Sequence, residues 1–136
     1  MSRYTVLIDG HAGNYGVIFP DLPGCTAMGE TIDEALNNAV ESLRQWAEIA
    51  SARGRAIPAP RSPDAIRADA QFAGDFAAGA TLGHVTLVLR LGRTVKANLS
   101  LDSGILAEID ATAGRLGISR SAMVEKLAED RLPAFA

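Results

Sequence analysis

The sequence lacks the residues that could hold a fold together covalently or through a metal. Its one cysteine, Cys25, cannot form a disulfide within the chain, and its two histidines, His11 and His84, lie far apart. Structural metal sites need several cysteine or histidine ligands at short, regular spacings. We therefore expect no disulfide, no metal and no other cofactor, so packing must stabilise the fold.

Long hydrophobic runs are also missing. No stretch of about 18 apolar residues, the length that a membrane-spanning helix needs, occurs in the sequence. The first residues do not form the basic, apolar and small-residue regions of a signal peptide. These absences predict a soluble, cytoplasmic protein with no membrane partner, and the length suits one ordinary domain or two small ones.

An excess of negative charge is confined to the front of the chain. Residues 1–60 carry four Arg against seven Asp or Glu, whereas residues 61–92 balance three against three and residues 93–136 balance six against six. Within the neutral tail, residues 93–101 contain two positive charges and no negative one. This segment is a small basic island.

Residues 1–91 have the pattern of an α+β domain. Two β-rich runs, 4–8 and 15–19, are joined by the turn-rich GHAGN loop and predict a hairpin. A turn rich in Pro and Gly then leads into a short strand around 25–28, and alternating apolar residues predict a further strand over 84–91. The expected architecture is thus about four antiparallel strands and one helix.

The helix of this domain has clear signals at both ends. Thr31 and Glu34 form a T-x-x-E capping box at its start, and Gly54 is placed to stop it near Ala52. Apolar residues at steps of three and four predict its buried stripe: Leu36, Val40, Leu43, Ala47 and Ala50.

The segment after this helix gives weaker signals. Residues 55–63 hold three prolines and suit an extended, semi-rigid connector. Residues 64–83 are rich in Ala and Gly, and only Phe72 and Phe76 stand out as large apolar groups that should pack. The sequence predicts no structure for this part.

The tail, residues 92–136, predicts one strand and two helices. Residues 94–101, TVKANLSL, alternate polar and apolar side chains. Asp102 is placed to cap a helix that stops at Gly117, and Ser119 is placed to cap a second helix. The expected buried sides comprise Ile105, Leu106, Ile109, Ala113 and Leu116 in the first helix, and Ala122, Met123, Val124 and Leu127 in the second.

A strand and two helices of about 40 residues cannot bury enough surface to be stable alone. Because the composition excludes metals and disulfides, the remaining solution is a homodimer in which the strand pairs with its twin and the apolar faces close over four helices. The polar face of the paired strands would then present Lys96, Asn98 and Ser100 twice. A two-stranded ribbon fits the DNA major groove, where Lys can donate to guanine, Asn can pair with adenine and Ser can donate or accept.

The start of the second tail helix has the features of an anion site. Its first turn offers free backbone N–H groups and the positive end of the helix dipole. The residues expected at DNA phosphates, there and at the start of the strand, are Arg93, Thr94, Gly117, Ser119, Arg120 and Ser121. The alternative, that residues 94–101 are an ordinary half-buried strand of a larger sheet, stays open.

The strand pattern, followed by D-x-x-I-L-x-x-I-D and R-L-G-I-S-R-S-A, resembles the ribbon-helix-helix family of dimeric repressors over residues 93–132. By that resemblance Lys96, Asn98 and Ser100 read bases, while Gly117, Ser119 and Arg120 hold phosphates.

The front half resembles a second family. The runs YTVLI, GNYGVIFPDLPGCTAMGET, IDEALNNAVESLRQWAE and IPAP are similar to the HicB antitoxins, whose N-terminal domain is described as a partial RNase H-like fold. The resemblance implies an antitoxin that neutralises a small, basic ribonuclease toxin of the HicA type and represses their shared operon by binding operator DNA. It divides the chain into a toxin-binding domain, 1–91, and a ribbon-helix-helix domain, 92–136, with assembly of dimers into a tetramer left open.

Two surfaces are candidates for toxin contact. Glu34, Glu41 and Glu48 recur every seven residues, so they form an acidic stripe on one helix face that would attract a basic partner. The same residues could equally be the solvated face of an amphipathic helix. The second candidate is the exposed part of a turn that contains Asp21, Leu22 and Cys25, although this turn could also be shaped for folding alone.

An RNase H-like ancestry raises the question of a nuclease. Two-metal nucleases need several carboxylates that converge on cations about 4 Å apart. Asp9 ends the first strand and Glu34 or Glu41 lies on the helix, but the strand over 84–91 has no carboxylate. We therefore expect no enzymatic activity. The remaining alternative is a stand-alone repressor whose front domain senses a small molecule or another protein.

Overall fold

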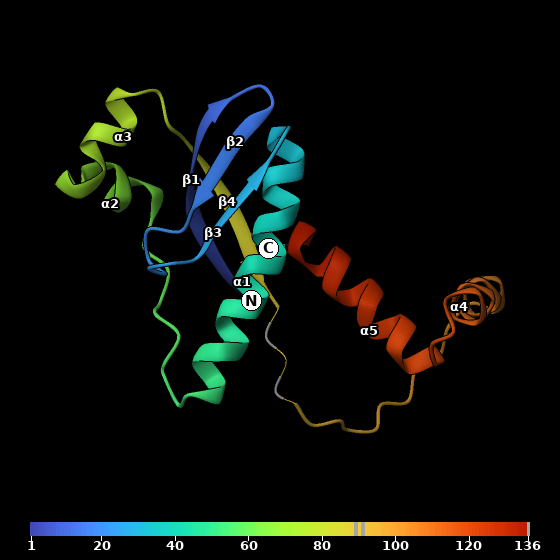
Figure 1. The fold of residues 1–136 in the computed structure, drawn as a ribbon. Coiled ribbons are helices and arrows are strands. Elements are labelled where there is room, and N and C mark those ends of the chain that lie inside the picture. The colour runs from blue at the N-terminus through green and yellow to red at the C-terminus, as the bar shows by residue number, and fades with distance from the viewer. Residues whose placement is uncertain (89, 91, 136) are drawn as a thin grey trace. The chain divides into compact units, whose positions relative to one another are not determined.

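The first strand has large apolar residues on both faces, and it is an interior strand of a four-stranded antiparallel sheet. β1 (Ser2–His11) pairs with β2 (Asn14–Ile18) and with β4 (Thr81–Leu87), and β3 (Thr26–Gly29) pairs with β2. The strand order is therefore β3-β2-β1-β4 (Figure 1). The computed structural model describes residues 1–88, 90 and 92–135, and within them the four expected antiparallel strands are confirmed.

The hairpin between β1 and β2 needs a glycine. Gly10 has a φ of +92°, and a Cβ atom there would lie 2.1 Å from the carbonyl oxygen of Asn14. At the other edge, β4 begins at Thr81, earlier than expected, because it pairs with most of β1. Leu89 and Leu91, at the far end of the expected strand, lie outside the described residues.

α1 (Ile32–Ala52) has both of the ends predicted for it. The Thr31 hydroxyl accepts a hydrogen bond from the Glu34 N–H at 3.1 Å, and Gly54, with a φ of +66°, follows the last turn. The Glu34 carboxylate accepts from the backbone N–H of Glu30 at 3.1 Å, one residue before the position that closes a capping box.

The buried stripe of α1 consists mainly of small residues, and this corrects the sequence prediction. The buried positions are Ala35, Ala39, Leu43, Ala47 and Ala50. Leu36 is only partly buried and Val40 is 37% exposed, because the helix turns its small side chains to the sheet. The helix backbone can then come very close: a Cβ atom on Gly29 of β3 would lie 2.4 Å from the backbone nitrogen of Ala35.

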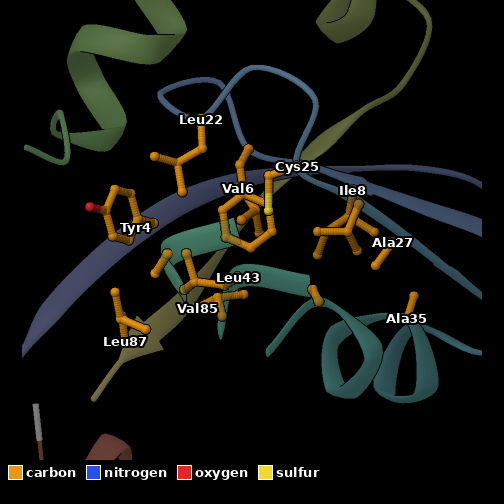
Figure 2. Packing of buried hydrophobic residues seen from close by; sticks show 14 residues of the cluster. Tyr4, Val6, Ile8, Leu22, Cys25, Ala27, Ala35, Leu43, Val85 and Leu87 are labelled. Atoms are coloured by element: carbon orange, nitrogen blue, oxygen red, sulfur yellow. The ribbon is translucent and has the colours of Figure 1, made fainter. Parts of the chain in front are cut away.

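The main core lies between the sheet and α1. Figure 2 shows β1 side chains such as Tyr4 and Val6 packed with Leu43 of α1 and with Leu22 from the turn after β2. All four of these side chains have at most 1% of their surface exposed. The first unit therefore has a filled hydrophobic core of its own.

The opposite face of the sheet is covered by the segment for which the sequence predicted no structure. It forms α2 (Pro63–Ala68), a 3-10 turn (Ala70–Phe72) and α3 (Ala73–Ala77). Phe72 and Phe76 pack there as expected, together with Ile66, which is fully buried. The expectation that only the two phenylalanines would pack is wrong, because Ile66 meets Leu7 of β1.

The chain divides after Leu87 into two compact units, Met1–Leu87 and Val88–Ala136. The second unit contains α4 (Ser103–Leu116) and α5 (Arg120–Arg131). Both predicted caps are confirmed: the Asp102 carboxylate accepts from two backbone N–H groups of the first turn of α4, and the Ser119 hydroxyl accepts from Ala122 N–H. Within the described residues, no helix has both the length and the apolar character needed to span a membrane.

Candidate functional site

Residues 94–101 form neither a strand nor a helix in the single chain, and all of them are exposed. Val95 and Leu99 expose 83% and 66% of their surface, and Lys96, Asn98 and Ser100 are exposed beside them. The segment is therefore not part of the intrachain sheet, which excludes the alternative of an ordinary half-buried strand within this chain. Its pairing with a second copy stays a prediction.

The apolar sides of α4 and α5 are largely uncovered in the single chain. Only Ala113 and Met123 are buried in the described part of this unit. Ile105 exposes 57% of its surface and Leu127 exposes 40%, and both line a groove of about 620 Å³ between the two helices. The burial expected for these helices therefore needs a second surface, which this unit does not itself supply.

The start of α5 holds an arginine that is already paired. Arg120 donates from Nε and Nη2 to the two carboxylate oxygens of Asp110 on α4, with both distances 2.8 Å. The hydrogen bond from Arg120 holds the pKa of Asp110 below its usual value, and Asp110 raises the pKa of Arg120. Gly117 ends α4 with a φ of +67°, so the turn between the helices has the geometry that the sequence predicts.

The other residues expected at phosphates lie on the surface of the same unit. Arg93 and Thr94 line a hollow of about 400 Å³ beside Glu125 of α5. Ser121 is exposed in the first turn of α5. Arg90, which the sequence analysis did not single out, forms ion pairs with Glu125 at 3.3 Å and with Glu129.

In the first unit, the turn proposed for toxin contact turns its side chains inward. Leu22 is fully buried and Cys25 is 3% exposed, and burial raises the pKa of the Cys25 thiol to about 11. The Asp21 side chain is 6% exposed and accepts from the backbone N–H of Arg61 at 2.8 Å and from its Nε at 2.5 Å. The three side chains named from the sequence are thus engaged within the fold, and Pro23 and Gly24 at the tip of the turn are exposed.

Two residues that hold this turn were missed in the sequence analysis. Arg61 also reaches Asp69, with Nη1 2.9 Å from the carboxylate, and Trp46 Nε1 donates to the Pro23 carbonyl at 3.3 Å. Both lie more than 20 positions along the chain from the turn residues they bind. No local sequence pattern reports such distant pairs, so only the fold could identify them.

The acidic stripe is on the exposed side of α1, but its members are unequal. Glu34 is used at the helix start, and Glu41 accepts from Arg44 at 3.0 Å and from Gln45 at 3.1 Å. Glu48 is exposed and has no hydrogen bond or ion pair within the described part of the chain. The stripe is available to a partner, and Glu48 is its least engaged carboxylate.

Comparison with known proteins assigns this pair of units to a family. A family profile described as "HicB_like antitoxin of bacterial toxin-antitoxin system" matches residues 4–128. The chain belongs to the HicB-like antitoxin family. The resemblance seen in the front half of the sequence is therefore confirmed. Since this is a family of antitoxins and not of enzymes, the expectation of no catalysis is confirmed with it.

Solved HicB structures agree with this assignment, and one curated relative is similar to part of the chain. The antitoxin is similar to the Burkholderia pseudomallei antitoxin HicB, with a TM-score of 0.54, 25% identity and 98% of each chain covered. It is similar to a chain of the HicA3 and HicB3 toxin-antitoxin complex, with a TM-score of 0.52 and 26% identity over 62% of this chain and 95% of that chain. UPF0150 protein Ta0767 of Thermoplasma acidophilum is 39% identical over 57 residues, which span 41% of this antitoxin and 83% of the relative.

Proposed function

We propose that this antitoxin acts in the cytoplasm, where its first domain, residues 1–91, binds and neutralises a small HicA-like ribonuclease toxin. Its second domain, residues 92–136, would form a homodimer that binds operator DNA and represses the shared operon. The observation that carries the toxin half is the family match, which extends over both units from residue 4 to residue 128. The similarity to a chain of a HicA3 and HicB3 complex supports the choice of toxin.

The observation that carries the DNA-binding half is the uncovered apolar face of the second unit. We infer a ribbon-helix-helix dimer in which Val95 and Leu99 of the two copies turn inward. Ile105, Leu116 and Leu127, all at least 40% exposed in the single chain, would then be covered by the partner helices. Lys96, Asn98 and Ser100 would face the major groove, which is wide enough for two paired strands.

The fold of the first unit supports a partial RNase H-like description, which remains part of the proposal. Its β1-β2-β3 meander leads directly into α1, and the exposed face of α1 carries the acidic stripe. We propose Glu41 and Glu48 as the toxin-contacting members of that stripe, because a basic toxin would be attracted to carboxylates that face solvent. The family match disfavours a stand-alone repressor, and assembly of dimers into a tetramer stays open.

Growth rescue tests the toxin half directly. The antitoxin is co-expressed with a short reading frame adjacent to its own, and we expect cells that express this frame to grow only when the antitoxin is also present. The affinity of the purified pair is then measured for Glu41→Gln/Glu48→Gln and for a matched control, Asp64→Asn/Asp75→Asn, which removes the same charge from α2 and α3.

We expect the α1 variant to bind several-fold more weakly at low salt and the control to bind like the wild type. A wild-type chain that gives no rescue would show the antitoxin proposal to be wrong for this neighbour. Equal affinities for the two variants would leave the antitoxin role intact and move the contact away from α1.

A further inference from the structure

Three positively charged side chains lie in the proposed DNA-binding surface, and they differ in whether an acidic side chain is bound to them. Arg93 and Lys96 belong to the segment that would form the ribbon, and Arg120 begins α5. In the described part of the chain, neither Arg93 nor Lys96 has an ion-pair partner. Arg120 alone is neutralised, by Asp110.

The Asp110–Arg120 pair is not needed to hold α4 and α5 together. The turn between the helices is determined by its own caps, since Gly117 ends α4 in the left-handed conformation and Ser119 caps α5. The two side chains are 43% and 59% exposed, and exposed ion pairs contribute little to stability. Stabilisation of the helix pair therefore does not explain why Asp110 lies within hydrogen-bond distance of Arg120.

The geometry of the pair has a clear consequence for an anion. A guanidinium binds a phosphate best through two parallel N–H groups, as it binds a carboxylate. Asp110 occupies such a pair, Nε and Nη2, with both distances 2.8 Å. A phosphate group that approaches the start of α5 must displace the carboxylate or bind beside its negative charge.

We propose that Asp110 restrains the binding of DNA phosphates at Arg120 and so lowers the affinity of the antitoxin for all duplex DNA. The inference rests on the proposed DNA-binding function. Because phosphate contacts carry no sequence information, weakening them leaves a larger share of the binding energy to the base contacts of the ribbon. Asp110 is thus a residue that sets affinity, and it touches no base.

The test uses the full-length antitoxin and two probes: a 30-base-pair duplex from directly upstream of its own reading frame, on the order of one repressor site with flanks, and a scrambled duplex of equal composition. Asp110→Asn keeps the shape of the side chain and removes its charge. We expect both duplexes to be bound about three- to tenfold more tightly. The dependence of log affinity on log salt should steepen by up to about 1.8, one extra phosphate contact from each protomer.

Three further variants make the test specific. Arg120→Gln should weaken binding to both duplexes, and adding Asp110→Asn to it should then tighten binding much less than Asp110→Asn does alone, because most of the effect of the carboxylate acts through the arginine. Glu108→Gln removes a charge from the same helix, two positions away, where no ion pair is found in the described residues. We expect this control to change the affinity by less than about twofold.

The outcomes separate the two proposals. Tighter binding of both duplexes by Asp110→Asn, most of which disappears when Arg120→Gln is also present, supports the restraint. Unchanged or weaker binding by Asp110→Asn overturns it while leaving DNA binding intact. A wild-type protein that binds neither duplex at low salt would overturn the DNA-binding function itself, and the restraint with it.

Discussion

The two units of this antitoxin bury their hydrophobic residues to very different extents. The first unit closes both faces of its sheet, with α1 on one side and with α2 and α3 on the other, and buries large residues such as Tyr4, Phe19 and Ile66 almost completely. In the described part of the second unit, only Ala113 and Met123 are buried. The first unit therefore completes a hydrophobic core of its own, whereas the second unit, taken by itself, does not.

The two units should therefore owe their stability to different sources. The first unit can be stable at any protein concentration, because the surface that it buries is its own. A unit that depends on a second copy is stabilised by association, so its apparent stability rises with concentration. Substitutions at buried positions of the first unit should lower stability equally at all protein concentrations. Substitutions at exposed apolar positions of the second unit should act by preventing association.

The largest expected effect is at an exposed position. Leu99 is 66% exposed in the single chain, so Leu99→Asp would shift the stability of an isolated tail by no more than about 0.5 kcal/mol. In the proposed dimer the same change buries two carboxylates in an apolar interface, and we expect the dimer and its DNA binding to be lost. Sedimentation equilibrium measures the mass of the particle.

A neighbouring substitution serves as the control for this prediction. Asn98→Asp introduces the same charge on the opposite, polar face of the segment. It should leave the dimer intact while weakening DNA binding. A dimer that survives Leu99→Asp would contradict the assignment of Leu99 to the interface.

The second effect tests the first unit. Leu43 is fully buried between α1 and the sheet, and Leu43→Ala should lower the free energy of unfolding by about 2–5 kcal/mol. The loss should be the same at low and high protein concentration in chemical denaturation. Val40→Ala, on the same helix but 37% exposed, should cost less than about 1 kcal/mol. Equal losses of stability for the two variants would contradict the structure, in which α1 buries Leu43 and leaves Val40 exposed.

The smallest effect concerns sequence preference. Asn98→Ala should reduce discrimination against a changed base pair by about 1–3 kcal/mol at one position of each half-site, because the amide can no longer pair with adenine. Melting temperature and dimerisation should stay as in the wild type. Binding to a panel of operators with single base changes measures this. A variant with the wild-type pattern of preferences would exclude Asn98 from base reading.

Local signals in the sequence predicted much of this fold. The caps at Thr31, Asp102 and Ser119 and the stop at Gly117 were all predicted correctly, because each depends on a few neighbouring residues. The antiparallel strands followed from alternation and turn chemistry for the same reason. These features need no knowledge of the rest of the chain.

The sequence predicts burial wrongly where contacts between distant segments determine which side chains are covered. The stripe of α1 was predicted to contain Leu36 and Val40, but close approach to β3 favours the small residues Ala35 and Ala39. The sequence does not predict the burial of Ile66, because its partner, Leu7, lies far away along the chain.

The candidate toxin-contact turn shows the same limit of local reasoning. Leu22 and Cys25 are candidates for toxin contact by their place in a turn, whereas the structure packs both into the core. A tight turn rich in Pro and Gly is visible in the sequence, but which of its side chains turn inward depends on α1 and on Arg61.

The proline-rich connector after α1, residues 55–63, is tied to other parts of the first unit by polar contacts. The Tyr4 hydroxyl donates to the Pro58 carbonyl at 2.6 Å. Arg61, near the end of the connector, forms ion pairs with both Asp21 and Asp69. Arg61 thus links the turn after β2, through Asp21, to the end of α2, through Asp69. Lengthening this segment would shift Pro58 and Arg61 relative to their partners, and the hydrophobic core on each face of the sheet would then have to hold its layer without these polar contacts.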